Sequence, residues 1–111
     1  MHRMLTNAVL VVTALLVTSG IASAQDAAAG EKVYAAQKCA VCHSIAGVGN
    51  KKGPLDGVAA KVSAADLRQW IVDAPAMAAK TKADRKPPMK AYPNLSKADV
   101  DALVAYMQTL K

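Results

Sequence analysis

The chain has 111 residues, a formal net charge of +6 and 53% hydrophobic residues. This length accommodates one small domain, and an apolar fraction this high, beside 20% charged residues, excludes a disordered chain. The two cysteines are too few for a secreted domain held together by many disulfides.

The chain begins with the three parts of a cleavable signal peptide. A short basic region (residues 2–3) precedes an apolar run (8–17), and an Ala-Ser-Ala sequence at 22–24 has the small residues that a signal peptidase accepts. The apolar run is short for a membrane span, so an uncleaved anchor is the less favoured alternative. We expect residues 1–24 to be removed during export to the periplasm, which leaves residues 25–111 as one domain without a stable membrane insertion.

Three segments of the mature chain have helical patterns, and none has the alternation of a strand. Asp26 can cap a first helix over residues 27–37. Ser63 opens a second helix with the spacing of a capping box, and Pro75 ends it. Ser96 opens a third helix with the same spacing, and its apolar stripe continues to the end of the chain.

Two long loops separate these helices, over residues 44–62 and 75–95. The first is rich in glycine and the second in proline. Ordered loops of roughly twenty residues in compact domains are usually functional. The mature chain also has about as many alanines as large apolar residues, and alanine buries little surface. A small domain with so few large apolar side chains buries little surface. This indicates that something other than side chains fills its centre.

Residues 39–43 carry the chemistry, as Cys39-Ala40-Val41-Cys42-His43. Two thiols at this spacing can each add to a vinyl group of one haem, and the histidine that follows can bind the iron. A thioredoxin-like redox pair would need a βαβ context, and a zinc site would need a second pair of ligands. A structural disulfide is a further alternative. The adjacent histidine, the export signal and the thin core favour haem.

The order of the motifs resembles the class I monohaem cytochromes c over residues 26–111. The motifs are Gly30-x-x-x-Tyr34, Cys39-x-x-Cys42-His43, Gly53-Pro54-Leu55, Trp70-Ile71, Pro87-Pro88-Met89-x-Ala91-Tyr92, Leu95-Ser96 and Leu103-Val104-Ala105-Tyr106-Met107-x-x-Leu110. The resemblance implies an all-α fold of three or more helices around one covalently bound haem c and its iron. It also implies that the first and last helices cross at Gly30, beside Tyr34 and Tyr106.

The second axial ligand decides what the iron can do. His43 is the only histidine of the mature chain, so a second histidine ligand is excluded. Met107 lies on the apolar stripe of the last helix, so we expect it to pack in the core. We expect Met77 to fill a gap in the packing. Met89 follows two prolines whose restricted backbone can hold a thioether in place, and the family has its axial methionine in this loop. We predict Met89 as the ligand, with Met77, a lysine or an open position as alternatives.

The resemblance implies roles for three further residues. The carbonyl of Pro54 is expected to accept a hydrogen bond from Nδ1 of His43, which fixes the tautomer of the ligand. Leu55 is expected to pack on the haem. Trp70 is expected to line the pocket and to direct its indole N–H toward a haem propionate. An ordinary turn at Pro54 and ordinary core packing of the tryptophan are the alternatives.

Basic residues lie in the two loops expected to border the haem: Lys51, Lys52, Lys86 and Lys90. They predict a docking surface for acidic faces of redox partners, with an ordinary solvated surface as the alternative. No nucleic-acid motif is present, so no nucleic-acid partner is expected, and we expect a monomer.

Filled axial positions favour a periplasmic one-electron carrier over an enzyme. The alternatives are a haem c subunit of a larger periplasmic oxidoreductase and a gas-binding haem sensor whose sixth ligand is displaceable.

Overall fold

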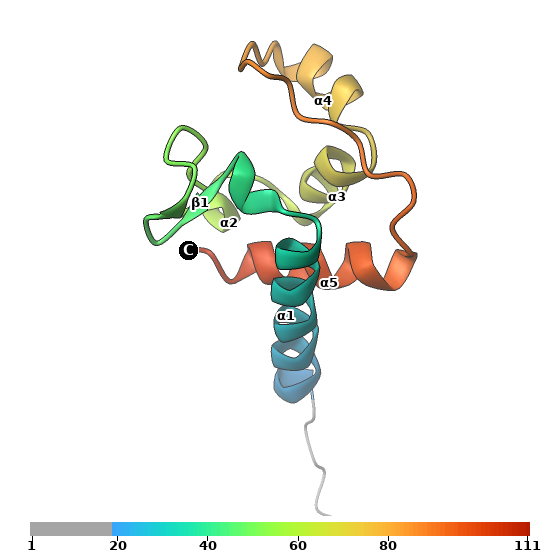
Figure 1. The fold of residues 1–111 in the computed structure, drawn as a ribbon. Coiled ribbons are helices and arrows are strands. Elements are labelled where there is room, and N and C mark those ends of the chain that lie inside the picture. The colour runs from blue at the N-terminus through green and yellow to red at the C-terminus, as the bar shows by residue number, and fades with distance from the viewer. Residues whose placement is uncertain (1–18) are drawn as a thin grey trace, which may run out of the picture.

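The computed structural model describes the backbone of residues 19–111 and the side chains of residues 26–111. The elements are α1 (Ser19–Ala36), the 3₁₀ helix η1 (Cys39–Val41), β1 (Ser44–Ile45), β2 (Val48–Gly49), α2 (Val58–Lys61), α3 (Ala64–Val72), α4 (Ala74–Thr81) and α5 (Lys97–Gln108). The described part is therefore mainly helical, as predicted (Figure 1). The predicted signal peptide lies largely outside these residues, and its cleavage stays a prediction. No helix in the described part has the length and apolar character to cross a membrane.

Helices α1 and α5 cross at close range, and Gly30 makes the approach possible (Figure 1). A Cβ atom at residue 30 would lie 2.6 Å from the carbonyl carbon of Ala102 and 2.7 Å from Cβ of Tyr106. The rings of Tyr34 and Tyr106 pack edge to face beside the crossing, with 5.8 Å between their centroids. The predicted crossing of the first and last helices is confirmed.

The serine caps of the other two predicted helices are also confirmed. The hydroxyl of Ser63 accepts a hydrogen bond of 3.2 Å from the backbone N–H of Asp66, and α3 follows. The hydroxyl of Ser96 accepts one of 3.1 Å from the N–H of Asp99 at the start of α5. Each bond satisfies a donor that the first turn of a helix leaves free.

The core is small and lies between α3 and α5. Its buried members are Leu67, Ile71, Val100, Leu103, Val104 and Met107. Half-buried residues of α1, α2 and the loops surround these six, including Val33, Tyr34, Leu55, Val58 and Val62. The apolar side chains on one side of this cluster line the cavity described below.

Two predicted boundaries are wrong. Asp26 does not begin a helix, because α1 already runs through it from Ser19; alanine-rich sequence favours the helix on both sides. The second predicted helix does end before Pro75, because α3 stops at Val72, but Pro75 does not begin a loop as expected. It lies in the first turn of α4, where a missing N–H costs no hydrogen bond, and the side chain of Asp73 accepts a bond of 3.4 Å from the N–H of Ala76.

The predicted loop 44–62 contains more structure than expected. Strands β1 and β2 form an antiparallel hairpin in which Ser44 pairs with Gly49 and Ile45 with Val48. The short helix α2 follows. Strands of two residues are too short for a sequence alternation to reveal, which explains why the sequence predicts none.

Candidate functional site

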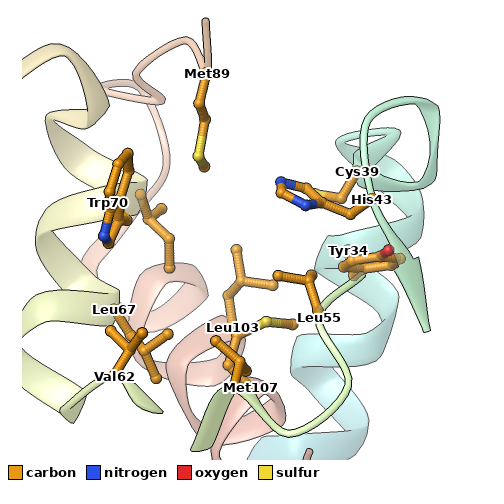
Figure 2. Close-up of a pocket in the computed structure, with 12 residues that line it drawn as sticks. Tyr34, Cys39, His43, Leu55, Val62, Leu67, Trp70, Met89, Leu103 and Met107 are labelled. Carbon is orange, nitrogen blue, oxygen red and sulfur yellow. The ribbon is translucent and has the colours of Figure 1, made fainter. Parts of the chain in front are cut away.

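Two adjoining cavities lie between the core and the loop that joins α4 to α5. The deeper one has a volume of about 180 Å³ and a wall of mostly apolar side chains from α1, α2, α3 and α5 (Figure 2). The outer one has a volume of about 510 Å³. Both are lined by Cys39, His43, Trp70 and Met89. The structure therefore brings these predicted site residues together around one hollow.

The helix η1 arranges the two cysteines at the edge of this hollow. The backbone N–H groups of Cys42 and His43 donate to the carbonyl of Cys39, over 3.1 and 2.9 Å, and this tight turn brings the three residues together. Cys39 is half-buried and lines both cavities, whereas Cys42 is exposed and lines the outer one. No disulfide joins the two cysteines. Burial raises the pKa of the Cys39 thiol above its ordinary value.

The imidazole of His43 is oriented by a backbone carbonyl, and the acceptor is Gly53 rather than the predicted Pro54. The distance from Nδ1 to the Gly53 oxygen is 3.0 Å. The N–H of Ser44 donates to the same oxygen over 3.1 Å, and Leu55 donates to the carbonyl of Ser44 over 2.8 Å. These two backbone bonds turn the Gly53 carbonyl toward the histidine, while Pro54 is exposed.

The hydrogen bond fixes how the imidazole can act. Because a carbonyl oxygen only accepts, the ring proton lies on Nδ1, and Nε2 keeps a free lone pair. Burial lowers the pKa of His43, the bond to Gly53 raises it, and the positive charge of Arg85 lowers it; the net direction is downward. The neutral form of the ring, which is the form that binds metals, is thus favoured.

The three methionines of residues 25–111 lie in different surroundings. Met89 is half-buried and lines both cavities, and its sulfur points from the top of the view into the space that the ring of His43 enters from the right (Figure 2). Met107 is 5% exposed and forms part of the floor of the deeper cavity, within the core. Met77 is 6% exposed in α4 and is absent from the residues that line the two cavities.

Two other predicted residues also line the hollow. Leu55 is half-buried in the wall of the deeper cavity, next to Leu103 and Met107 in Figure 2. Trp70 is half-buried and lines both cavities from α3. The predicted contact between its indole N–H and a propionate stays a prediction.

The sequence does not predict that further basic residues line the outer cavity. Its rim carries the basic side chains of Lys38 and Arg85, and Tyr92 also lines it. Arg85 donates a hydrogen bond of 2.5 Å from Nη2 to the carbonyl of Cys42. No motif signals an arginine at this place, because its partner is a backbone atom 43 residues away.

Tyr34 has an additional feature that its packing role does not explain. Its hydroxyl is buried and has no hydrogen-bond partner among the described residues. Burial, the largest cause, raises the pKa of this hydroxyl to about 12. The ring lines the deeper cavity beside Cys39 and His43. A sequence pattern predicts the packing of such a ring but not the state of its hydroxyl.

The donor set and the hollow fit a covalently attached haem. Two thiols lie at its edge, an imidazole with a free Nε2 and a thioether reach into it, and its inner wall is apolar. Thioether bonds from two cysteines and axial bonds from histidine and methionine use this combination of groups.

Comparisons with known proteins agree with this fit. The family model described as Cytochrome c matches residues 27–111. The chain is 30% identical over 91 residues to a protein of Alkalihalophilus pseudofirmus named cytochrome c oxidase subunit 2. The match covers 74% of this chain but spans only a quarter of the relative's length (25%). No solved structure matches. The chain belongs to the cytochrome c family, whose members transfer electrons by means of a covalently held haem c and its iron.

Proposed function

We propose that the chain is a periplasmic one-electron carrier whose haem iron is bound by His43 and Met89. The observation that supports this most directly is that both side chains line the same two cavities and point into the same space from separate segments of the chain (Figure 2). When bound, haem c supplies an iron that alternates between ferrous and ferric states. A thioether ligand favours the ferrous state and raises the reduction potential above that of two nitrogen ligands.

The residues of this chain have distinct tasks in the proposal. Cys39 and Cys42 tether the group through thioether bonds from one tight turn. The carbonyl of Gly53 keeps the proton of His43 on Nδ1, so that Nε2 is available. The apolar wall excludes water, which keeps the solvent reorganisation on electron transfer small. Since side chains fill both axial positions, a substrate has no open position, and the proposal is a carrier rather than an enzyme.

The basic residues support a proposal about partners. Lys90 lines the outer cavity, and its Nζ lies 5.3 Å from the centroid of the Tyr92 ring. Lys51, Lys52 and Lys86 are also exposed. We name Lys51, Lys52, Lys86 and Lys90 the lysine surface. It would attract acidic faces of redox partners of a monomeric carrier and accelerate their encounter.

The attachment is tested by expressing the full chain with a haem-maturation system. We expect a pigmented protein that has lost residues 1–24, retains its pigment in acidified acetone, and gives a reduced-minus-oxidised spectrum. Replacement of both cysteines by serine is the matched control and should release the pigment. A colourless wild-type protein, or one whose pigment is extracted, would contradict the proposal.

The axial assignment is tested by comparing two methionines. Met89→Ala should abolish the weak far-red absorption that sulfur ligation gives the ferric protein, and should lower the reduction potential. Met77→Leu retains the buried volume in α4 and should leave both unchanged. Loss of the band in Met77→Leu rather than Met89→Ala, or rapid CO binding by the ferrous wild type at neutral pH, would contradict the assignment.

The relative supports a second candidate function. Its name is cytochrome c oxidase subunit 2, and this chain matches only a quarter of it. The chain could therefore serve as the haem c part of a larger oxidoreductase. A catalytic partner that copurifies with the chain in stoichiometric amount would favour this candidate over the free carrier.

A further inference from the structure

The loop that carries Met89 is fastened to the rest of the molecule on both sides of this residue. Three residues after it, the backbone N–H of Tyr92 donates a hydrogen bond of 2.9 Å to the carbonyl of Ile71 on α3. Four residues before it, Nη2 of Arg85 donates one of 2.5 Å to the carbonyl of Cys42. The first contact fixes the loop to a helix. The second fixes it to the segment that bears the histidine.

Arg85 touches that segment at a second place. A Cβ atom at Gly53 would lie 2.8 Å from Cζ of Arg85, so the guanidinium rests against the backbone of Gly53. Gly53 supplies the carbonyl that orients His43, and Cys42 directly precedes that histidine. One side chain of the Met89 loop therefore contacts both backbone supports of the opposite ligand.

We propose that Arg85 is a positioning residue that fastens the Met89 loop to the His43 segment and thereby keeps the thioether in place against competing ligands. The inference rests on the proposed ligation by His43 and Met89. Lys38 and Lys90 also contribute positive charge to the outer cavity, but Arg85 adds a hydrogen bond and a close contact with Gly53. A guanidinium can make both contacts at once, whereas an ammonium group presents one compact charge.

The test is a titration of the ferric, haem-loaded protein with imidazole, which competes for the position of the thioether. Loss of a hydrogen bond from a charged donor should shift the loop toward open conformations, and we expect Arg85→Ala to bind imidazole about tenfold more tightly than wild type. Arg85→Lys should bind more tightly than wild type as well. It also replaces Arg85→Ala in the comparison if the alanine variant gives no haem-loaded protein.

A second readout does not depend on the haem spectrum. Amide hydrogen exchange over residues 86–91 should be faster in both variants, because Arg85 no longer holds the amino-terminal side of the loop. Exchange in α1 and α5 should be unchanged. A general loss of stability would instead accelerate exchange throughout the core.

Two control variants separate positioning from charge and from stability. Lys80→Ala removes a positive charge from an exposed residue of α4. Asp101→Asn removes the carboxylate charge of Asp101 and with it the ion pairs to Lys97 and Arg68, away from the loop. Both should bind imidazole with wild-type affinity. Tighter binding by either one, equal to that of Arg85→Ala, would overturn the inference.

The outcomes also separate this inference from the proposed function. If the wild-type protein lacks the far-red sulfur band, ligation by Met89 is refuted. The role of Arg85 in ligand competition is then refuted as well. A wild-type protein with the band, together with an Arg85→Ala variant of unchanged imidazole affinity and exchange, would refute the role of Arg85 alone. Wild-type behaviour of Arg85→Lys in both readouts would show that any cation suffices, and would likewise overturn the proposed role of Arg85.

Discussion

The Nδ1 atom of His43 lies 3.0 Å from the carbonyl oxygen of Gly53, and this contact joins the histidine to a peptide that is itself firmly held. The same oxygen accepts a hydrogen bond of 3.1 Å from the N–H of Ser44, which is only 2% exposed. Arg85 rests against Gly53 from the side of the methionine loop. The orientation of the imidazole thus depends on a residue that has no side chain of its own.

Gly53→Ala tests this dependence. The new methyl group would lie 2.8 Å from Cζ of Arg85 and would also collide with the carbonyl oxygen of Cys42. Because a backbone atom cannot move as freely as the end of a side chain, we expect the free energy of unfolding of the haem-loaded protein to fall by about 1–3 kcal/mol. Denaturant unfolding, followed by haem absorption, measures this change.

Gly57→Ala is the matched control for this prediction. Residue 57 has open space around its Cβ position but a φ of 77°, so alanine there meets backbone strain without a collision. We expect a cost of about 1–2 kcal/mol and an unchanged haem spectrum. If Gly53→Ala leaves both the spectrum and the stability at wild-type values, the tight contact at residue 53 is wrong.

Gly30→Ala tests the crossing of α1 and α5. In an exposed helix this change would stabilise the protein by about 1 kcal/mol. At residue 30 the added Cβ would lie 2.6 Å from the carbonyl carbon of Ala102, so the two helices must separate. We therefore expect a net loss of about 1–3 kcal/mol, measured by denaturant unfolding.

Ala29→Gly provides the comparison for this second prediction. Ala29 is exposed on α1, and glycine there should cost about 1 kcal/mol through helix propensity alone. A more stable Gly30→Ala variant would contradict the close approach.

Local sequence signals predicted the helices with capping boxes and the residues around the hollow. Ser63 and Ser96 each lie three residues before the donor that they cap, so the spacing alone is informative. The spacing of Cys39, Cys42 and His43 likewise carries its chemistry within five residues. The crossing at Gly30 followed from the resemblance, because its partner helix lies some seventy residues further along the chain.

The features that the sequence did not predict depend on contacts between distant backbone atoms. The bridge between residues 44 and 54 decides whether the carbonyl of Gly53 or that of Pro54 faces His43. No residue type predicts this bridge. The role of Pro75 was ambiguous, because proline is excluded from the middle of a helix but suits its first turn. The contact of Arg85 with Cys42 joins two segments through a carbonyl that every residue possesses.

Asp101 predicts how the stability depends on pH. Hydrogen bonds from Lys97 and Arg68 hold its pKa below the ordinary value of 3.8. A carboxyl group with a lowered pKa stabilises the folded state while it is ionised, and this contribution is lost as the pH falls below the ordinary value and through the lowered one. The stability difference between wild type and Asp101→Asn should therefore be constant near neutral pH and should disappear in strong acid.

Salt provides a check on the Asp101 prediction. All three side chains are partly or largely exposed, so added salt should screen the ion pairs and reduce the difference between the two proteins. Unfolding curves at several pH values and two ionic strengths measure both effects. If the stability difference between wild type and Asp101→Asn grows toward acid pH, the ionised carboxylate of Asp101 does not stabilise the folded state.

The lysine surface predicts how the protein reacts with charged redox reagents. Lys86→Glu with Lys90→Glu should slow electron transfer from the ferrous protein to the anion hexacyanoferrate(III) by about tenfold at low salt, because attraction becomes repulsion. The same double variant should accelerate transfer to a cationic cobalt(III) complex. Stopped-flow rates at two ionic strengths measure both, and Lys32→Glu with Lys61→Glu provides a control of equal charge change. An altered reduction potential would move both rates in the same direction, whereas a docking surface moves them in opposite directions.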